Sequence, residues 1–212
     1  MTSQLLLPTR GPRLAHRFTN LVVGLVLFGL GIGLMLQSRL GVPPWDVLHQ
    51  GLALHFGLSV GIWSIIVSGL VLVAWLPLRE PFGVGTLLNA IIIGVVIDLS
   101  AWLIPQPEAL IARGVMLAAG IVMVGFASGL YIGASLGPGP RDGLMTGIAR
   151  LGPSVRLTRT VIEVVVLAAG WLLGGTFGVG TVAFAVFIGP IVQFFLPRLH
   201  VDIDAVSTTR AR

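Results

Sequence analysis

Two short segments of the sequence place a carboxylate just inside the start of a predicted helix. Residues 40–46 (LGVPPWD) and 136–142 (LGPGPRD) share a glycine, a proline and an aspartate at the same spacing. A proline suits the first helical position, because the N–H that it lacks would have no partner there. The remaining free N–H groups carry partial positive charge and can hold an anion or a carboxylate. These segments predict a site for a small anionic or zwitterionic solute.

The two aspartates of these segments, Asp46 and Asp142, have two interpretations. Each either caps its own helix by accepting hydrogen bonds from first-turn N–H groups, or serves as a gating or proton-binding carboxylate. Trp45 precedes the first aspartate and Arg141 precedes the second, so the predicted site is asymmetric. We expect Arg141 to supply a cationic contact and Trp45 an aromatic lid. His49 is either a proton relay beside Asp46 or a histidine at the membrane surface.

Two further acidic residues, Asp98 and Glu163, lie well inside apolar segments, where an ionisable side chain is costly and marks function by default. Glu163 follows Arg159 by four residues, so a structural ion pair on one helix face is its alternative role. Asp98 has no such neighbour, and we expect it to couple transport or contact the solute unless it extends toward the outer face. Asn89, nine residues before Asp98, is expected to face the same cavity.

The composition identifies a membrane protein. Of 212 residues, 55% are hydrophobic and only 10% are charged, and the mean hydropathy is +0.99. Soluble proteins carry about a quarter charged residues, so this surface must face lipid. The 13 basic residues are all arginine, and the net charge of +5 is not concentrated in a block of the kind that binds nucleic acid. Without cysteine or lysine, and without a metal-ligand cluster or hydrolytic triad, we expect no metal, no cofactor and no enzymatic activity.

Six apolar stretches are long enough, or nearly so, to cross about 30 Å of hydrocarbon as helices. They cover residues 20–37, 58–77, 84–104, 114–134, 160–175 and 178–196. Residues 44–56 and 140–151 are too short to cross, so they predict half-helices that enter the membrane or lie at its surface. The predicted fold class is an all-α polytopic membrane protein with six transmembrane helices and two short half-helices.

The positions of the arginines predict the orientation of these helices. With the N-terminus in the cytoplasm, eleven of the thirteen lie on the cytoplasmic side, and only Arg39 and Arg113 lie outside. An excess of arginine in short cytoplasmic loops is the usual pattern, so both termini are expected in the cytoplasm. No small-residue cleavage site follows the first apolar stretch, which we expect to be retained as a helix. The bacterial inner membrane is the expected location.

The chain consists of two copies of one unit. At an offset of 96 residues, Gly41, Pro44 and Asp46 align with Gly137, Pro140 and Asp142. At an offset of 95, the G-V-G-T motif at 83–86 recurs at 178–181. Three crossings per unit invert one copy relative to the other, which is the architecture of many secondary transporters. The alternative is that duplication only doubled a stable bundle. We divide the chain into a cytoplasmic tail (1–19), repeat 1 (20–112), repeat 2 (113–197) and a second cytoplasmic tail (198–212).

Glycines and prolines at these related positions are expected to form turns, hinges and close helix contacts. Two spans open on G-V-G-T, which contributes Gly85 and Thr86 in the first copy and Gly180 and Thr181 in the second. Glycine there allows a neighbouring helix or a ligand to approach closely. Pro190 is expected to kink or break the last span near the middle of the membrane.

A family resemblance is carried by four segments: LGVPPWDVLHQGL, GVGTLLNAIIIGVVID, LGPGPRDGLM and GWLLGGTFGVGTVAFAVFIGP. They resemble the YczE, YyaS and YitT group of bacterial integral membrane proteins in the order and spacing of glycine, proline and aspartate. The resemblance covers nearly the entire chain and implies a multi-pass membrane protein. Related genes are associated with metabolite uptake, secondary-metabolite production or pyridoxal-phosphate-binding regulators, so it also implies transport of a small metabolite. It brings no substrate-binding residues with it.

Three functions are compatible with these features. The first is a small-metabolite secondary transporter or permease, with a site at the membrane midplane between inverted repeats. The second is a membrane-embedded substrate-binding subunit of a larger uptake complex. The third is a non-transporting accessory or regulatory protein. The lipid bilayer is the expected partner in every case, and each function is compatible with a homodimer.

Overall fold

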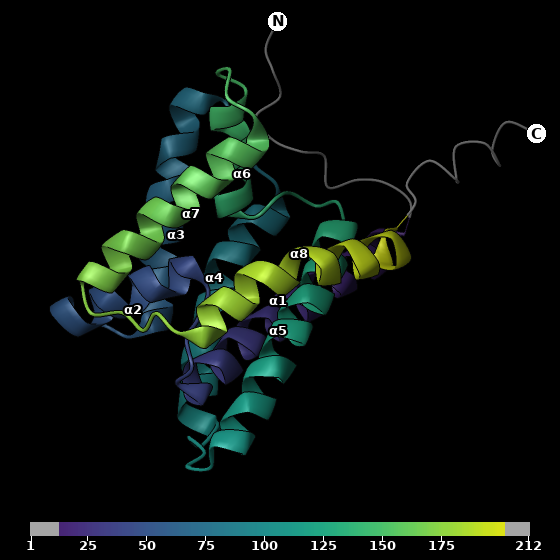
Figure 1. The fold of residues 1–212 in the computed structure, drawn as a ribbon. Helices are drawn as coiled ribbons and strands as arrows, with labels where there is room; N and C mark the ends of the chain where they lie inside the picture. The colour runs from purple at the N-terminus through teal and green to yellow at the C-terminus, as the bar shows by residue number, and fades with distance from the viewer. Residues whose placement is uncertain (1–12, 202–212) are drawn as a thin grey trace, which may run out of the picture.

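The computed structural model describes residues 13–201, which form eight α-helices (Figure 1). In chain order these are α1 (Leu14–Ser38), α2 (Pro44–Phe56), α3 (Val60–Leu78), α4 (Val84–Leu103), α5 (Leu110–Gly133), α6 (Pro140–Ala149), α7 (Val155–Leu172) and α8 (Val179–Leu199). The pattern of α1–α4 recurs in α5–α8, with a short helix second in each half. Most of the predicted cytoplasmic tails lies outside the described residues.

Five of these helices have the length and hydropathy of a membrane span: α1, α3, α4, α5 and α8. The sixth predicted span is present as the 18-residue helix α7 but is not among the five. It carries Arg156, Arg159 and Glu163, and these charges set it apart from the other spans. The predicted half-helices are present as α2 and α6, which at 13 and 10 residues are too short to cross the membrane.

Related helices begin with the same residues in the two halves. Ser59 and Ser154, at the offset of 95, are the N-caps of α3 and α7, and each hydroxyl accepts a backbone hydrogen bond of 3.2 Å from the first turn. Both half-helices begin with a proline, Pro44 in α2 and Pro140 in α6. Local sequence therefore fixes where these four helices start.

The antiparallel pair of α1 and α5 forms the centre of the molecule (Figure 1). Gly24, early in α1, lies against Leu130 late in α5, and Gly31 lies against Gly120. A Cβ atom added to Gly24 would come within 3.0 Å of the Leu130 Cβ, so only glycine permits this approach. The hydrophobic effect does not drive helices together inside a membrane. Small residues favour association there because they let the helix backbones pack closely.

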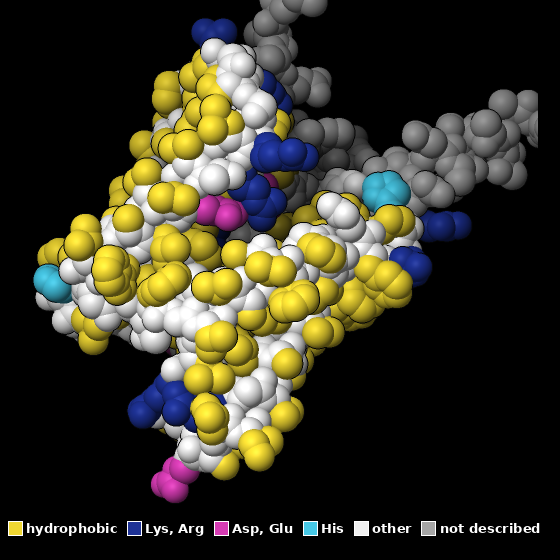
Figure 2. All heavy atoms as spheres, in the orientation of Figure 1, with side chains coloured by type: hydrophobic (Ala, Val, Ile, Leu, Met, Phe, Trp, Pro, Cys, Tyr) yellow, Lys and Arg dark blue, Asp and Glu magenta, His cyan; other side chains and the backbone are white. Residues whose placement is uncertain are grey.

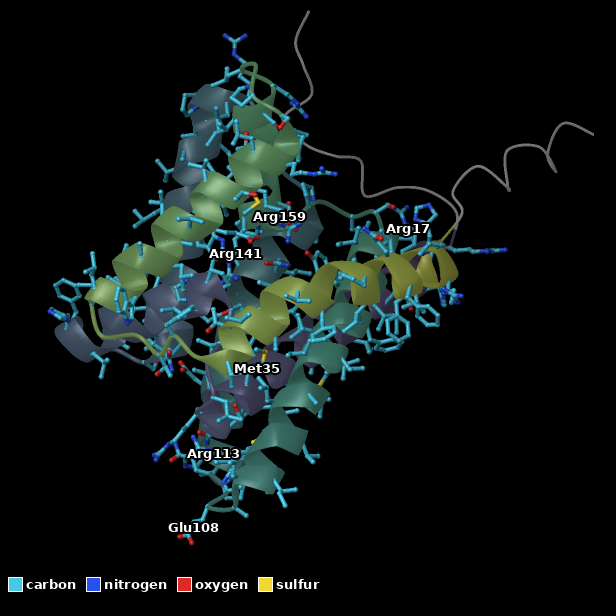
Figure 3. All side chains as sticks on the ribbon, in the orientation of Figure 1. Arg17, Met35, Glu108, Arg113, Arg141 and Arg159 are labelled. Atoms are coloured by element: carbon cyan, nitrogen blue, oxygen red, sulfur yellow. The ribbon has the colours of Figure 1, made fainter. Side chains whose placement is uncertain are left out.

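Two arginines join the ends of this central pair in a reciprocal way. Arg17 of α1 donates to the carbonyls of Ala134 and Ser135, at 2.8 and 2.7 Å, just beyond the C-terminus of α5. Its counterpart at the offset of 96 is Arg113, which donates to the carbonyls of Ser38 and Arg39, at 2.7 and 2.9 Å, where α1 ends. Figure 3 places the two arginines at opposite ends of the pair. Each guanidinium neutralises the partial negative charge of the other half's helix end.

The G-V-G-T motifs and the turns before the half-helices also bond across the two halves. The Gly85 N–H donates to the Leu136 carbonyl at 2.9 Å, and the related Gly180 N–H donates to the Leu40 carbonyl at 2.7 Å. The Thr86 hydroxyl donates to the carbonyl of Pro138 at 2.8 Å. Each turn is therefore held by the span that opens in the opposite half.

Each half-helix also packs against the third helix of the opposite half, α6 on α3 and α2 on α7. At Gly143 the ring of Trp75 occupies the space of a side chain, and the Trp75 indole N–H donates to the Pro140 carbonyl at 3.0 Å. In the related contact, Gly170 of α7 lies against the backbone of Val47. The large and the small residue have exchanged places between the halves, so the two contacts match in position but differ in shape.

Pro190 lies inside an α8 that continues through it.

We expect Gly137→Ala to destabilise the protein through its contact with the opposite half. Gly137 has a φ of +129°, and an added Cβ would lie 2.7 Å from the Thr86 Oγ1 atom and 2.8 Å from the Gly83 Cα atom. Gly152 has a similar φ of +131°, but nothing lies within 4 Å of an added Cβ, so Gly152→Ala is the matched control for backbone strain. Overpacking should lower the free energy of unfolding of Gly137→Ala by about 1–3 kcal/mol more than that of the control. Thermal unfolding in detergent measures both, and equal losses would contradict the contact.

Candidate functional site

A cavity of about 310 Å³ lies where the two halves meet, and all eight helices contribute to its wall. Six of the seven predicted solute-contacting residues line it: Trp45, Asp46, Asn89, Arg141, Asp142 and Glu163. The apolar part of the wall includes Phe28, Ile32, Val124, Phe184 and Ile188. A small apolar chamber with a few converging polar groups is typical of a small-molecule site.

The first turns of the two half-helices meet in this cavity. Trp45 of α2 and Arg141 of α6, which occupy related positions, lie against one another, with the guanidinium carbon 5.2 Å from the centre of the indole ring. The same guanidinium lies 3.7 Å from the Oδ1 atom of Asp46. That separation is longer than a hydrogen bond, so the charges attract without being tightly joined.

Asp46 is fully buried, and only one of its two carboxylate oxygens has a hydrogen-bond partner. Its Oδ1 atom lies 3.1 Å from Nδ1 of His49, which is also fully buried. The Asp46 Oδ2 atom has no hydrogen-bond partner in the described structure, and neither has the indole N–H of Trp45. His49 is therefore a buried partner of Asp46 and not a surface histidine. Because unpartnered buried polar atoms are costly, the free groups of Asp46 and Trp45 mark a place for a ligand or water.

Asp142 differs from Asp46 in its partner. Its Oδ2 atom accepts a hydrogen bond of 2.9 Å from the hydroxyl of Tyr131 on α5. Among the described residues, no hydrogen bond joins either aspartate to a first-turn N–H, and α2 and α6 have no side-chain cap. The carboxylates are therefore directed to the side chains of His49 and Tyr131 and not to their own helix ends.

Charged side chains stand at the opening of the cavity between α7 and α8. Arg159 and Glu163 of α7 form an ion pair at 2.9 Å, with side chains 55% and 31% exposed. Figure 2 shows basic and acidic side chains in the hollow between these helices, and Figure 3 places Arg141 and Arg159 there. The predicted pairing on one helix face is present, and it occurs at the rim of the cavity.

The two related helix pairs that flank the cavity have different separations. In the first half, α3 packs along α4, and a Cβ added to Gly61 would lie 2.1 Å from the Gly94 carbonyl oxygen. In the second half, α7 packs on α2 and α6 while α8 packs on α5, with no comparable contact between α7 and α8. Gly189, the counterpart of Gly94, has no atom within 4 Å of an added Cβ and lines the cavity. The cavity is thus closed between α3 and α4 and open between α7 and α8.

Asp98, the seventh predicted residue, does not line the cavity. Its Oδ1 atom accepts the Gly61 N–H at 2.8 Å, and its Oδ2 atom accepts the Ser59 hydroxyl at 2.5 Å. These bonds join α4 to the start of α3. Its counterpart at the offset of 95 is Gln193 of α8, which does line the cavity. Asp98 therefore holds the closed helix pair together and does not contact the cavity, and its expected role in coupling transport stays a prediction.

Several wall residues were not predicted from the sequence. Ser64, Ser68 and Ser128 line the cavity, as does Tyr131, the only tyrosine in the chain. Isolated serines in apolar helices give no clear signal. Aligning the repeats would have found two of them, because Ser64 and Ser68 are the counterparts of Arg159 and Glu163. Within residues 13–201, no group of three His, Asp or Glu side chains could hold a metal ion.

Residues 15–197 match the profile of a family described as a family of unknown function, DUF6198. The chain belongs to this family. The match spans all but the ends of the chain, so the eight helices and the cavity lie within the family's common region.

Three curated proteins are also similar to the chain. An uncharacterised protein of Haemophilus influenzae is 42% identical over 83% of this chain and 81% of its own length. The uncharacterised membrane protein YczE of Bacillus subtilis is 37% identical over 87% of each chain, and YyaS of the same organism is 29% identical over 82% and 90%. No solved structure matches. The expected resemblance to a YczE-like family of bacterial membrane proteins is therefore confirmed.

We expect Asp98→Ala to lower stability through the loss of its bonds to α3. Losing two hydrogen bonds near a helix N-terminus should lower the free energy of unfolding by about 1–3 kcal/mol. Thermal unfolding in detergent measures the change. Glu108→Ala is the control, because that carboxylate is exposed in the α4–α5 connection and extends away from the molecule (Figure 3). An Asp98→Ala protein as stable as the control would contradict the structural role.

Proposed function

We propose that the protein is a secondary transporter or permease for a small anionic or zwitterionic metabolite. The observation that carries the proposal is the unequal spacing of related helix pairs around one cavity: α3 and α4 are closed, and α7 and α8 are open. In transporters built from two inverted copies, each copy adopts the conformation of the other when the site switches sides. A fixed binding site has no need of such an asymmetry.

This proposal includes an inverted arrangement of the two repeats in the bacterial inner membrane, with both termini in the cytoplasm. The arginine distribution supports that orientation. Six crossings require α7 to span together with the five more apolar helices. The charged residues of α7 that line the cavity then face its interior and its opening instead of lipid. In this orientation the opening near Arg159 and Gln193 faces the cytoplasm.

The opposite state follows from the repeat alignment. The α3–α4 contact at Ser59 and Asp98 corresponds to Ser154 of α7 and Gln193 of α8. Closing α7 onto α8 would bring the second pair together, while opening α3 from α4 would separate the first. The cavity would then open to the outside.

Two alternatives remain distinct from this proposal. A substrate-binding subunit of an uptake complex would use the same cavity but would depend on a partner for movement. A non-transporting accessory protein would not need the cavity to change. Neither alternative requires α7 to close onto α8 as α3 is closed onto α4. A homodimer is compatible with any of these functions.

We expect two engineered cysteine pairs to report the two states. The natural chain has no cysteine, so only introduced thiols can react. In Ser59→Cys/Asp98→Cys the side chains already touch, and an oxidant should form the disulfide quickly. In Ser154→Cys/Gln193→Cys the bond can form only when α7 closes onto α8. If that state is populated at about 0.1–10%, oxidation should be slower by about 10–1,000-fold but should reach completion. Gel mobility of purified protein, with and without reductant, measures both rates.

The two pairs are matched, because each replaces an N-cap serine and a side chain of the neighbouring span. Each single-cysteine variant should form no internal disulfide. A Ser154→Cys/Gln193→Cys protein that stays reduced after prolonged oxidation, while the first pair is fully oxidised, would contradict alternating access and favour one of the alternatives. Equal rates for the two pairs would show that the opening between α7 and α8 is not a stable feature.

A further inference from the structure

We propose that the cavity binds a zwitterionic amino compound, with its ammonium group on Asp46 and its carboxylate on Arg141. This assignment rests on the proposed function and narrows its solute from anionic or zwitterionic to zwitterionic alone. It also gives each charge of the solute a named partner on a different half-helix.

The acceptor for the ammonium group is the free oxygen of Asp46. Asp46 is 0% exposed and lines the cavity, and its Oδ2 atom has no partner while Oδ1 faces His49. A carboxylate oxygen accepts hydrogen bonds and cannot donate them, so only a donor can satisfy this atom. A purely anionic solute would bring a second carboxylate toward a buried negative charge and leave the Oδ2 atom unpaired.

The partner for the carboxylate is Arg141, whose side chain is only 24% exposed. Its guanidinium lies over the indole face of Trp45 and 3.7 Å from the Asp46 carboxylate, and no hydrogen bond from its five donors appears among the described residues. A guanidinium forms paired hydrogen bonds with a carboxylate. The loose contact between Arg141 and Asp46 therefore leaves both groups free to take opposite ends of one solute.

The other charges of the cavity are already paired more closely. Asp142 accepts from Tyr131 at 2.9 Å, and Glu163 lies 2.9 Å from Arg159. Asp46 and Arg141 face each other with opposite charge at 3.7 Å, which is a looser contact than either of these. The volume of about 310 Å³ is at the small end of the range for small-molecule sites, and its apolar wall can receive a hydrocarbon side chain. An amino acid has this combination of size, charge and apolar side chain.

A matched set of probes tests each charge separately. L-phenylalanine, 2-phenylethylamine and 3-phenylpropanoate share a ring and a two-carbon linker. L-phenylalanine carries both charges, 2-phenylethylamine carries only the ammonium group, and 3-phenylpropanoate carries only the carboxylate. L-leucine, 3-methylbutylamine and 4-methylpentanoate repeat the comparison without a ring. A ligand that binds only the native state raises the unfolding temperature, so thermal unfolding of the full chain in detergent is the measurement. We expect a zwitterion to raise it, with little effect from the matching amine and acid.

Three variants assign the partners. Asp46→Asn keeps the size of the side chain and an acceptor for His49, and it should weaken binding of the zwitterion by about tenfold or more. Arg141→Gln, in a partly exposed side chain, should weaken it by a similar factor and serves if Asp46→Asn does not fold. Glu108→Gln also changes a carboxylate to an amide, at an exposed position outside the cavity, and should leave the affinity unchanged.

The outcomes separate this inference from the proposed function. An amine or an acid that binds as well as its matching zwitterion would overturn the assignment, as would the absence of a shift with all six probes. Unchanged affinity in both Asp46→Asn and Arg141→Gln would also overturn it. The disulfide experiment needs no solute, so alternating access can stand when the zwitterion fails, and a zwitterion can bind to a cavity that never switches.

Discussion

A backbone N–H or C=O group cannot be left unpaired in hydrocarbon, and this constraint governs how the two halves of the protein meet. In each half, a turn and a half-helix separate the first long helix from the next. The carbonyls of that turn have no partner within their own helix. The opposite half supplies the donors: Gly180 reaches Leu40, and Gly85 reaches Leu136. Arg17 and Arg113 do the same for the ends of the central helices. The cavity can exist because these contacts close the irregular backbone around it.

Duplication explains both the similarity of the halves and the chemistry of the site. Related backbone positions make related contacts, but the side chains there have diverged. Trp45 and Arg141 occupy one position in two copies and now contact one another. Asp98 and Gln193 also occupy one position in two copies: Asp98 bonds within a tightly packed helix pair, whereas Gln193 lines the polar opening. A single unit paired with an identical copy would place like charges opposite each other, whereas two diverged copies can place a cation beside a carboxylate.

Much of this architecture was predictable because its signals are local or periodic. Apolar length located the helices, the prolines located the half-helices, and the repeat offset related the halves. Five of the six predicted residues that line the cavity stood out because a carboxylate, an arginine or a tryptophan is unusual in such a setting, and Asn89 was named for its place near Asp98. The bonds of Asp98 could not be predicted because its partners are Ser59 and the Gly61 N–H, 37–39 residues away, and neither carries a charge that a search of nearby sequence would detect. Tyr131 and the cavity serines depend on tertiary contacts alone, so sequence spacing could not reveal them.

The exchanged bonds also determine when the protein can complete its fold during synthesis. The Leu40 carbonyl belongs to the first part of the chain to enter the membrane, but its partner, the Gly180 N–H, is synthesised about 140 residues later. At an elongation rate of about 5–20 residues per second, that turn waits for about 7–28 seconds with its partner missing. The first half therefore inserts as an unfinished structure that water, lipid headgroups or the insertion machinery must protect. Neither half is a folding unit of its own, and the last helix to emerge completes the turn that follows the first.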